Sequence, residues 1–159
     1  FVLVVPPHPQ IFSKDDFASL HSHVDMFSVM TYDFSNPSRP GPSSPTQWIV
    51  QTVLSLLGQK QRTAEKAKKL AMGINFYGND FIKPQGGGAI VNSQYLDLIK
   101  AQKPKIKWDS EVEEHFFEYK KKSSPQKHIV YFPTLFYIKK RLELAESMGT
   151  SISIWELGQ

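Results

Sequence analysis

The sequence predicts an α/β fold built on a parallel sheet, arranged as half of a (β/α)8 barrel. Segments with the composition of strands alternate with segments of helical periodicity, as expected for βα units joined by right-handed crossovers. The first and last strand-like segments also lack the charges and prolines that protect the edges of an open sheet, so we expect the sequence to be a fragment of a closed barrel. The strand-like segments are residues 1–5, 25–32, 70–77 and 151–155.

The first two strands and the helix between them are expected near the amino terminus. Residues 1–5 are apolar at every position and stop at Pro6-Pro7, which predicts a strand covered on both faces rather than an edge strand. Ser13 is followed by an acidic residue three positions later, a pattern typical of the start of a helix. The second strand, residues 25–32, ends at Asp33.

A loop and a longer helix connect the second strand to the third. Residues 36–45 are rich in Pro, Ser and Gly, which predicts a loop. We expect Ser44 to cap the next helix, with Pro45 at its first helical position and Gly58 at its end. The polar residues 62–69 are compatible with either a helical turn or a surface linker.

Residues 79–133 interrupt this alternation. Glycine-rich and short alternating segments there predict a small α+β insertion within a single domain that spans residues 1–159. The predicted elements of the insertion are a helix at 95–101 and strands at 105–109, 115–119 and 128–132.

The last helix has clear boundary signals. Thr134 is expected to cap it, and Gly149 lies just past its end, before the final strand. The residues assigned to its inward face are Leu135, Ile138, Leu142, Leu144 and Ala145.

The composition limits the chemistry that the chain can perform. It contains no cysteine, which excludes disulfides, thiol catalysis and Cys-ligated zinc. No apolar run approaches the roughly 20 residues of a membrane helix, and the first residues lack a signal-peptide pattern. The net charge of +4 is interpreted as solvated surface rather than a nucleic-acid interface. His21 and His23 are spaced by two, which does not suit a helical pair of metal ligands, so we expect neither a metal nor a cofactor.

Residues that suit a sugar-binding site follow several of the predicted strands. In parallel βα barrels the active site forms where the strands end. Aromatic rings stack on sugar rings, and Tyr, Asp and Asn side chains satisfy the hydroxyl and amide groups of a sugar. The residues expected to bind substrate are Met30, Tyr32, Asp33, Asn75, Tyr77, Trp155 and Glu156.

Three motifs, in the same order along the chain, resemble glycoside hydrolase family 18. Residues 30–33, Met-Thr-Tyr-Asp, match the Met-x-Tyr-Asp signature of the family's sixth strand. Residues 73–78 resemble the seventh strand and residues 154–156 the eighth, so the resemblance implies the carboxyl-terminal half of a barrel. The chain is most similar to the chitinase-domain-containing, or stabilin-interacting chitinase-like, branch in residues 106–109, 114–119 and 155–159.

The resemblance implies a role for three of these residues. Tyr32 would donate a hydrogen bond to the acetamido oxygen of the sugar, Asp33 would orient the sugar, and Trp155 would form the floor of the subsite. Family 18 hydrolases use the acetamido oxygen as the nucleophile while a glutamic acid on the fourth strand protonates the leaving oxygen. The Asp-x-x-Asp-x-Asp-x-Glu motif that carries this acid does not occur in the 159 residues, so no catalytic residue is assigned within them.

Three functions are compatible with these observations. The leading hypothesis is a chitinase-like protein that binds N-acetylglucosamine-containing oligosaccharides with little or no hydrolysis. An active family 18 glycosidase, with its acid on a strand outside these residues, is the main alternative. In the third, the barrel is a scaffold that binds another protein, such as a cell-surface receptor. The resemblance also implies a secreted or lysosomal protein.

Several of these residues also have simpler interpretations. Tyr32 and Asp33 could merely end a strand and turn the loop, and Trp155 could be a core aromatic residue. Glu156 could face the barrel mouth or pair with Arg141 or a nearby lysine. Residues 115–117 could line an extended saccharide groove, and the carboxylates expected at the surface of the insertion are Glu111, Glu113, Glu114 and Glu118.

Overall fold

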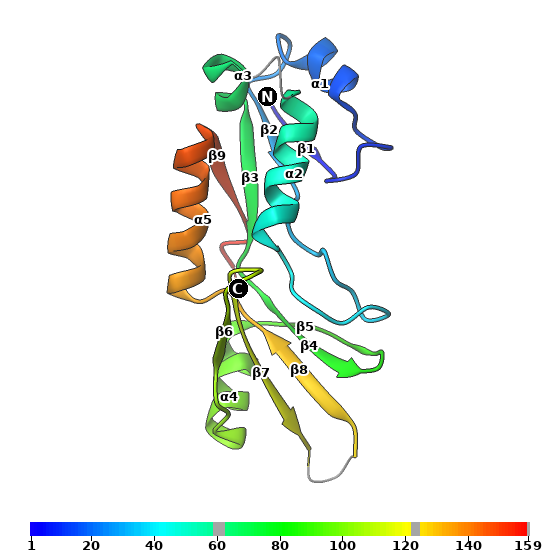
Figure 1. The fold of residues 1–159 in the computed structure, drawn as a ribbon, viewed down its shortest axis with the longest axis vertical. Helices are drawn as coiled ribbons and strands as arrows, with labels where there is room; N and C mark the ends of the chain where they lie inside the picture. The colour runs from blue at the N-terminus through cyan, green and yellow to red at the C-terminus, as the bar shows by residue number, and fades with distance from the viewer. Residues whose placement is uncertain (59–62, 122–124, 159) are drawn as a thin grey trace.

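The structure of the protein is a computed structural model that describes residues 1–58, 63–121 and 125–158. Within these residues the strands form two sheets, which lie at opposite ends of the molecule (Figure 1). The first sheet is parallel, in the order β1 (Val2–Val5), β2 (Met26–Val29), β3 (Leu70–Asn75) and β9 (Ser151–Trp155). The second sheet is antiparallel, in the order β5 (Gly87–Ile90), β4 (Gly78–Lys83), β8 (Lys127–Tyr131), β7 (Glu114–Lys120) and β6 (Lys107–Asp109).

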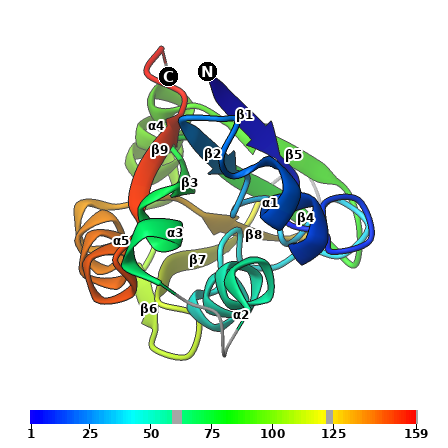
Figure 2. The same ribbon diagram turned by 90° about the horizontal axis from the view of Figure 1, so that it is seen from above.

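Helices cover one face of each sheet. The described helices are α1 (Lys14–Leu20), α2 (Thr46–Leu57), α3 (Ala64–Lys68), α4 (Asn92–Gln102) and α5 (Leu135–Met148). Seen from above, α1, α2 and α5 are arranged around the parallel sheet (Figure 2), whereas α4 packs on the second sheet. Within the described ranges, none of these helices has the length and apolar character needed to cross a bilayer.

The parallel sheet has one packed face and one open face. Leu3 and Val5 of β1 pack into the core that α1 and α2 complete. Val2 and Val4, on the opposite face, are 55% and 54% exposed. The prediction that this strand is covered on both faces is therefore wrong for this chain, because β1 lies at the end of the strand order and helices cover only one of its faces.

Most of the predicted helix boundaries are confirmed. Ser13 accepts from the backbone of Asp16 and forms the full capping box, and Thr134 caps α5 by accepting from Tyr137 N. Gly149 adopts the left-handed conformation with φ of 64°. Residues 63–69, one part of the stretch left open between helix and linker, contain α3, while Arg62 lies outside the described residues.

The predicted start of α2 is wrong by one residue. The helix begins at Thr46, its N-cap position is Pro45, and no side chain caps it. The hydroxyl of Ser44 instead donates to the carbonyl of Thr31 at 2.7 Å, so this serine joins the end of β2 to the start of α2.

The second sheet branches from the first at Gly78, where β3 gives way to β4. A Cβ on Gly78 would lie 2.4 Å from the Phe132 ring and 2.5 Å from the Tyr131 carbonyl oxygen, so only glycine fits at this branch point. One face of the second sheet packs on α4 through Phe117 and Val130. The other face is turned toward the loop that follows β2, and Gly86 N donates to Pro37 O at 2.7 Å across this contact.

Candidate functional site

The carboxyl ends of β2 and β3 bring Asp33 and two tyrosines together. The Tyr77 hydroxyl donates to Asp33 Oδ1 at 2.6 Å. The rings of Tyr32 and Tyr77 meet edge to face, with centroids 6.4 Å apart. Gly73 of β3 makes room for this pair, because a Cβ there would lie 2.8 Å from the Tyr32 ring and 2.5 Å from Val29 O.

Two pockets adjoin at Asp33, which lines both. The first has a volume of about 290 Å³ and lies at the ends of β1 and β2; the second has a volume of about 440 Å³ and lies between the loop after β2 and the start of the second sheet. The first pocket is lined by Pro6, Pro7, His8, Met30, Tyr32, Asp33, Phe34, Arg39 and Trp48. The second is lined by Asp33, Ser35, Asn36, Pro37, Tyr77, Asn79, Phe81, Gly88, Ala89 and Trp155.

The tyrosines of the site are hydrogen-bond donors at neutral pH. Burial raises the pKa of Tyr32, and the negative charge of Asp33 raises it further. Burial and then the hydrogen bond to Asp33 hold the pKa of Tyr77 well above its ordinary value. Each hydroxyl group therefore keeps its proton and can donate to an oxygen atom.

Trp155 supplies the exposed aromatic surface of the second pocket. Its side chain is at the end of β9, the residue is 53% exposed, and its carbonyl accepts from Phe76 N at 2.8 Å, which fixes the end of β9 beside the end of β3. Trp155 is therefore not a core residue in this structure. Glu156, the next residue, is exposed and lines neither pocket.

Asn75 lies beneath the pockets rather than in their walls. It is only 2% exposed, and its Nδ2 donates to Tyr77 O at 2.7 Å. Its Oδ1 accepts from the Tyr137 hydroxyl at 3.2 Å. The geometry thus gives Asn75 protein partners on both sides of its amide, and its predicted contact with a sugar stays a prediction.

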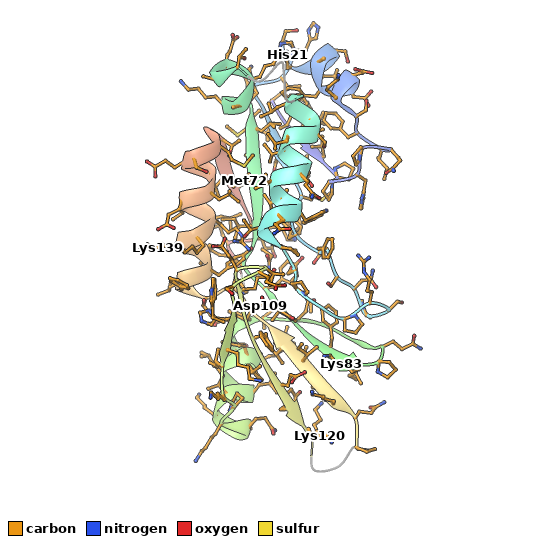
Figure 3. The ribbon with its side chains drawn as sticks, in the orientation of Figure 1. His21, Met72, Lys83, Asp109, Lys120 and Lys139 are labelled. Atoms are coloured by element: carbon orange, nitrogen blue, oxygen red, sulfur yellow. The ribbon has the colours of Figure 1, made fainter. Side chains whose placement is uncertain are left out.

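A buried ionic cluster behind the site contradicts two expectations. Glu114 was expected at the surface, but it is 4% exposed and accepts from the backbone of Ser43 and Ser44. Arg141 was a candidate partner of Glu156, but it is 1% exposed and donates to Ser44 O at 2.7 Å. Figure 3 shows Asp109 at the junction of the two sheets; burial raises the pKa of Glu114, and the charge of Asp109 raises it further.

The buried face of α5 differs from the predicted one. Leu135 and Leu142, assigned to the inward face, are 86% and 54% exposed. The buried residues of the helix are Tyr137, Arg141, Ala145 and Met148. Their helical spacing was present in the sequence, but an arginine and a tyrosine are not recognised as core residues without knowing their hydrogen-bond partners.

The stretch suggested as a saccharide groove is placed away from the pockets. Within the stretch suggested as a saccharide groove, Phe117 is buried under α4, and His115 contacts Thr134 through Nδ1 at 2.8 Å. None of residues 115–117 lines either pocket. Within the described part of the chain, no group of three or more His, Asp or Glu side chains is placed to hold a metal ion.

Comparison with known proteins relates the chain to one enzyme family. The sequence profile described as Glycosyl hydrolases family 18 matches residues 2–159. The Cortical fragment-lytic enzyme of Bacillus subtilis (strain 168) is 24% identical over 157 residues, which cover 92% of this chain and 34% of that protein. The chain spans about a third of the length of the curated relatives it matches.

Solved structures with sequence identity below 25% share the fold. The spore cortex-lytic enzyme SleL of Bacillus cereus has a TM-score of 0.82 at 23% identity, over 99% of this chain and 37% of that chain. The chitinase from Chromobacterium violaceum ATCC 12472 has a TM-score of 0.82 at 22% identity, over 99% of this chain and 50% of that chain.

Proposed function

The chain belongs to glycosyl hydrolase family 18, and from this premise we propose that its site binds N-acetylglucosamine-containing oligosaccharides of the chitin type. The observation that carries the proposal is the position of Asp33 between two pockets, with Tyr32 in the first and Tyr77 and Trp155 in the second. Aromatic surface next to hydroxyl donors and a carboxylate is the combination that a sugar ring with an amide substituent requires.

Each side chain has a distinct task in this proposal. The Tyr32 hydroxyl donates to the acetamido oxygen, a task supported by its raised pKa. Tyr77 occupies Oδ1 of Asp33, which leaves Oδ2 to accept from the sugar. Trp155 stacks on one face of the ring, and its 53% exposure supports this task. Met30 contributes apolar contact in the first pocket.

The proposed fold context is the carboxyl-terminal half of a (β/α)8 barrel. The parallel order of the four strands and the open face that exposes Val2 and Val4 support it, since the inner face of a closed barrel is covered by the other strands. We propose one domain of residues 1–159, in which residues 79–133 are an insertion that forms one wall of the second pocket. Asn79 and Phe81 of β4 line that wall.

Binding with little or no hydrolysis is the favoured form of the proposal. Family 18 catalysis requires a carboxylic acid that protonates the leaving oxygen while the acetamido oxygen attacks the anomeric carbon. The acidic motif that provides it is absent from these 159 residues, so Tyr32 and Asp33 could only orient the sugar for an acid located elsewhere. The names of the relatives, a lytic enzyme and a chitinase, support hydrolysis by the full-length protein as the second candidate.

Two further attributes are proposed from the resemblance of residues 106–109, 114–119 and 155–159 to the chitinase-domain-containing branch. The first is that the chain is a member of this branch. The second is that the protein is secreted or lysosomal. A cell-surface receptor would then be a second partner, for which the barrel provides the binding scaffold.

The test is calorimetric titration of the full-length protein with chitotetraose, with a reducing-end assay on the same samples. We expect Trp155→Ala to abolish measurable binding, because it removes the stacking surface. Leu157→Ala is the matched control, since Leu157 is 84% exposed and lines neither pocket. Binding without product would establish a lectin, and binding with product an enzyme. A wild-type protein that does not bind chitotetraose would refute the sugar site, and the scaffold function would replace it as the proposal.

A further inference from the structure

The backbone of Asp33 adopts a conformation that is unfavourable for residues with a Cβ atom. Its φ is 60°, in the left-handed region where the Cβ atom crowds the backbone. Such a residue keeps this conformation only when its surroundings hold it there. Two contacts from Ser43 do so: its Oγ accepts from Asp33 N at 3.4 Å, and its carbonyl accepts from Phe34 N at 2.8 Å.

Ser43 is in turn held by a carboxylate from the second sheet. Glu114, the first residue of β7, accepts from Ser43 N at 3.0 Å through Oε2 and from Ser44 N at 2.7 Å through Oε1. The two oxygens of a single buried side chain thus satisfy two consecutive backbone donors. This contact links β7 of the second sheet to the loop that follows β2 of the parallel sheet.

Arg141 of α5 holds the same turn from the opposite side. Its Nη2 donates to Ser44 O at 2.7 Å and to Val112 O at 3.1 Å, while its Nη1 donates to Thr46 Oγ1 at 2.8 Å. The guanidinium group lies 4.5 Å from the centre of the Tyr137 ring. The rigid fork of an arginine is suited to this task, because it fixes several acceptors in one plane.

A second series of contacts leads from the Ser43–Ser44 turn to the carboxylate of Asp33. Ser44 Oγ donates to Thr31 O at 2.7 Å and lies 3.4 Å from Asn75 Oδ1. Asn75 Nδ2 donates to Tyr77 O, and the Tyr77 hydroxyl donates to Asp33 Oδ1. The backbone of Asp33 and its side chain are therefore both fixed by contacts that begin at the Ser43–Ser44 turn.

We propose that Glu114 and Arg141 are positioning residues of the sugar site, which clamp the Ser43–Ser44 turn and thereby hold Asp33 in its binding conformation. This inference rests on the proposed sugar-binding function. Neither residue lines either of the two pockets at Asp33, so both act through the turn and not by contact with ligand. The second sheet is then more than a pocket wall, because one of its strands fixes a residue on the opposite wall.

The first test is chitotetraose titration of the full-length protein carrying Glu114→Gln. Glutamine has the same shape but places an NH2 donor against one of the two backbone N–H groups, so the turn loses one of its acceptors. We expect about a tenfold loss of affinity, the effect of breaking one buried hydrogen bond. Glu111→Gln is the matched control, because Glu111 lies in the adjacent turn and is exposed; its affinity should equal the wild-type value.

Amide hydrogen exchange separates positioning from general loss of stability. In Glu114→Gln we expect faster exchange at Asp33 and Phe34, with core amides such as that of Val29 unchanged. Acceleration of all amides to the same degree would mean that Glu114 only stabilises the fold, and would overturn the inference. If Glu114→Gln does not fold, Ser43→Ala takes its place, since it removes only the hydroxyl acceptor of Asp33 N.

The titration also separates this inference from the proposed function. A wild-type protein that does not bind chitotetraose would refute the proposed function, and the inference would fall with it. A wild-type protein that binds, together with a Glu114→Gln variant of equal affinity, would refute only the positioning role.

Discussion

Replacing Glu114 with Gln removes a carboxyl group whose ionisation is coupled to folding. Burial raises the pKa of Glu114 from the ordinary 4.5 to about 7, and the backbone N–H groups of Ser44 and Ser43 offset this only in part. Between these two values the folded protein keeps a proton that the unfolded chain releases. The stabilisation is therefore fully present below pH 4.5, declines as the pH rises toward 7, and does not change further above that.

The size of this decline follows from the two pKa values. A difference from 4.5 to about 7 corresponds to about 3 kcal/mol of unfolding free energy. We would measure urea unfolding of the wild type and Glu114→Gln at intervals from pH 4 to 8 and plot the difference in free energy. The wild type should lose about 3 kcal/mol relative to the variant across this window.

A matched variant controls for other titrating groups. Glu111→Gln removes an exposed carboxylate from the turn before β7, and it should follow the wild-type curve at every pH. The reasoning would be refuted by a difference between wild type and Glu114→Gln that stays constant over the window or that grows in favour of the wild type as the pH rises.

Three further substitutions test the packing and hydrogen bonds described above. Gly73→Ala should destabilise the fold by about 2 kcal/mol and displace Tyr32, because the added Cβ would meet Val29 O; equal urea midpoints for variant and wild type would contradict this. Tyr77→Phe should lower the free energy of unfolding by about 1 kcal/mol and weaken chitotetraose binding, since Asp33 loses the hydrogen bond that Tyr77 donates. An unchanged calorimetric affinity would show that this hydrogen bond does not support sugar binding. Ser13→Ala should cost about 1 kcal/mol in thermal or urea unfolding through loss of the α1 cap while leaving sugar affinity unchanged; a stability equal to that of the wild type would show that the cap contributes nothing.

Features determined by neighbouring residues were predictable from the sequence. The capping box at Ser13, the cap at Thr134 and the glycine at 149 are short-range patterns, and each forms as expected. The four strands of the parallel sheet were also predicted, because their apolar character identifies buried strands. Strands β4 and β5 of the second sheet were not predicted. Tyr32 follows β2 and Trp155 is the last residue of β9, and each lines one of the two pockets.

Features determined by distant contacts were not predictable in this way. Glu114 lies in a polar stretch and was assigned to the surface, yet it is buried because the backbone of a turn 70 residues earlier supplies two donors. Arg141 is buried because carbonyl groups from two separate segments, at Ser44 and Val112, accept from it. The face of α5 that carries Arg141 is the buried one, and Leu142, which an apolar stripe alone would have placed inside, is exposed.

The comparison of two tetrasaccharides tests the central claim most directly. Chitotetraose carries an acetamido group on each sugar, and cellotetraose has the same linkage without it. Titrated into the full-length protein, chitotetraose should bind at least about tenfold more tightly, because only chitotetraose carries the acetamido oxygen to which Tyr32 is proposed to donate. Equal affinities for the two sugars, or binding of neither, would contradict the assignment of this site.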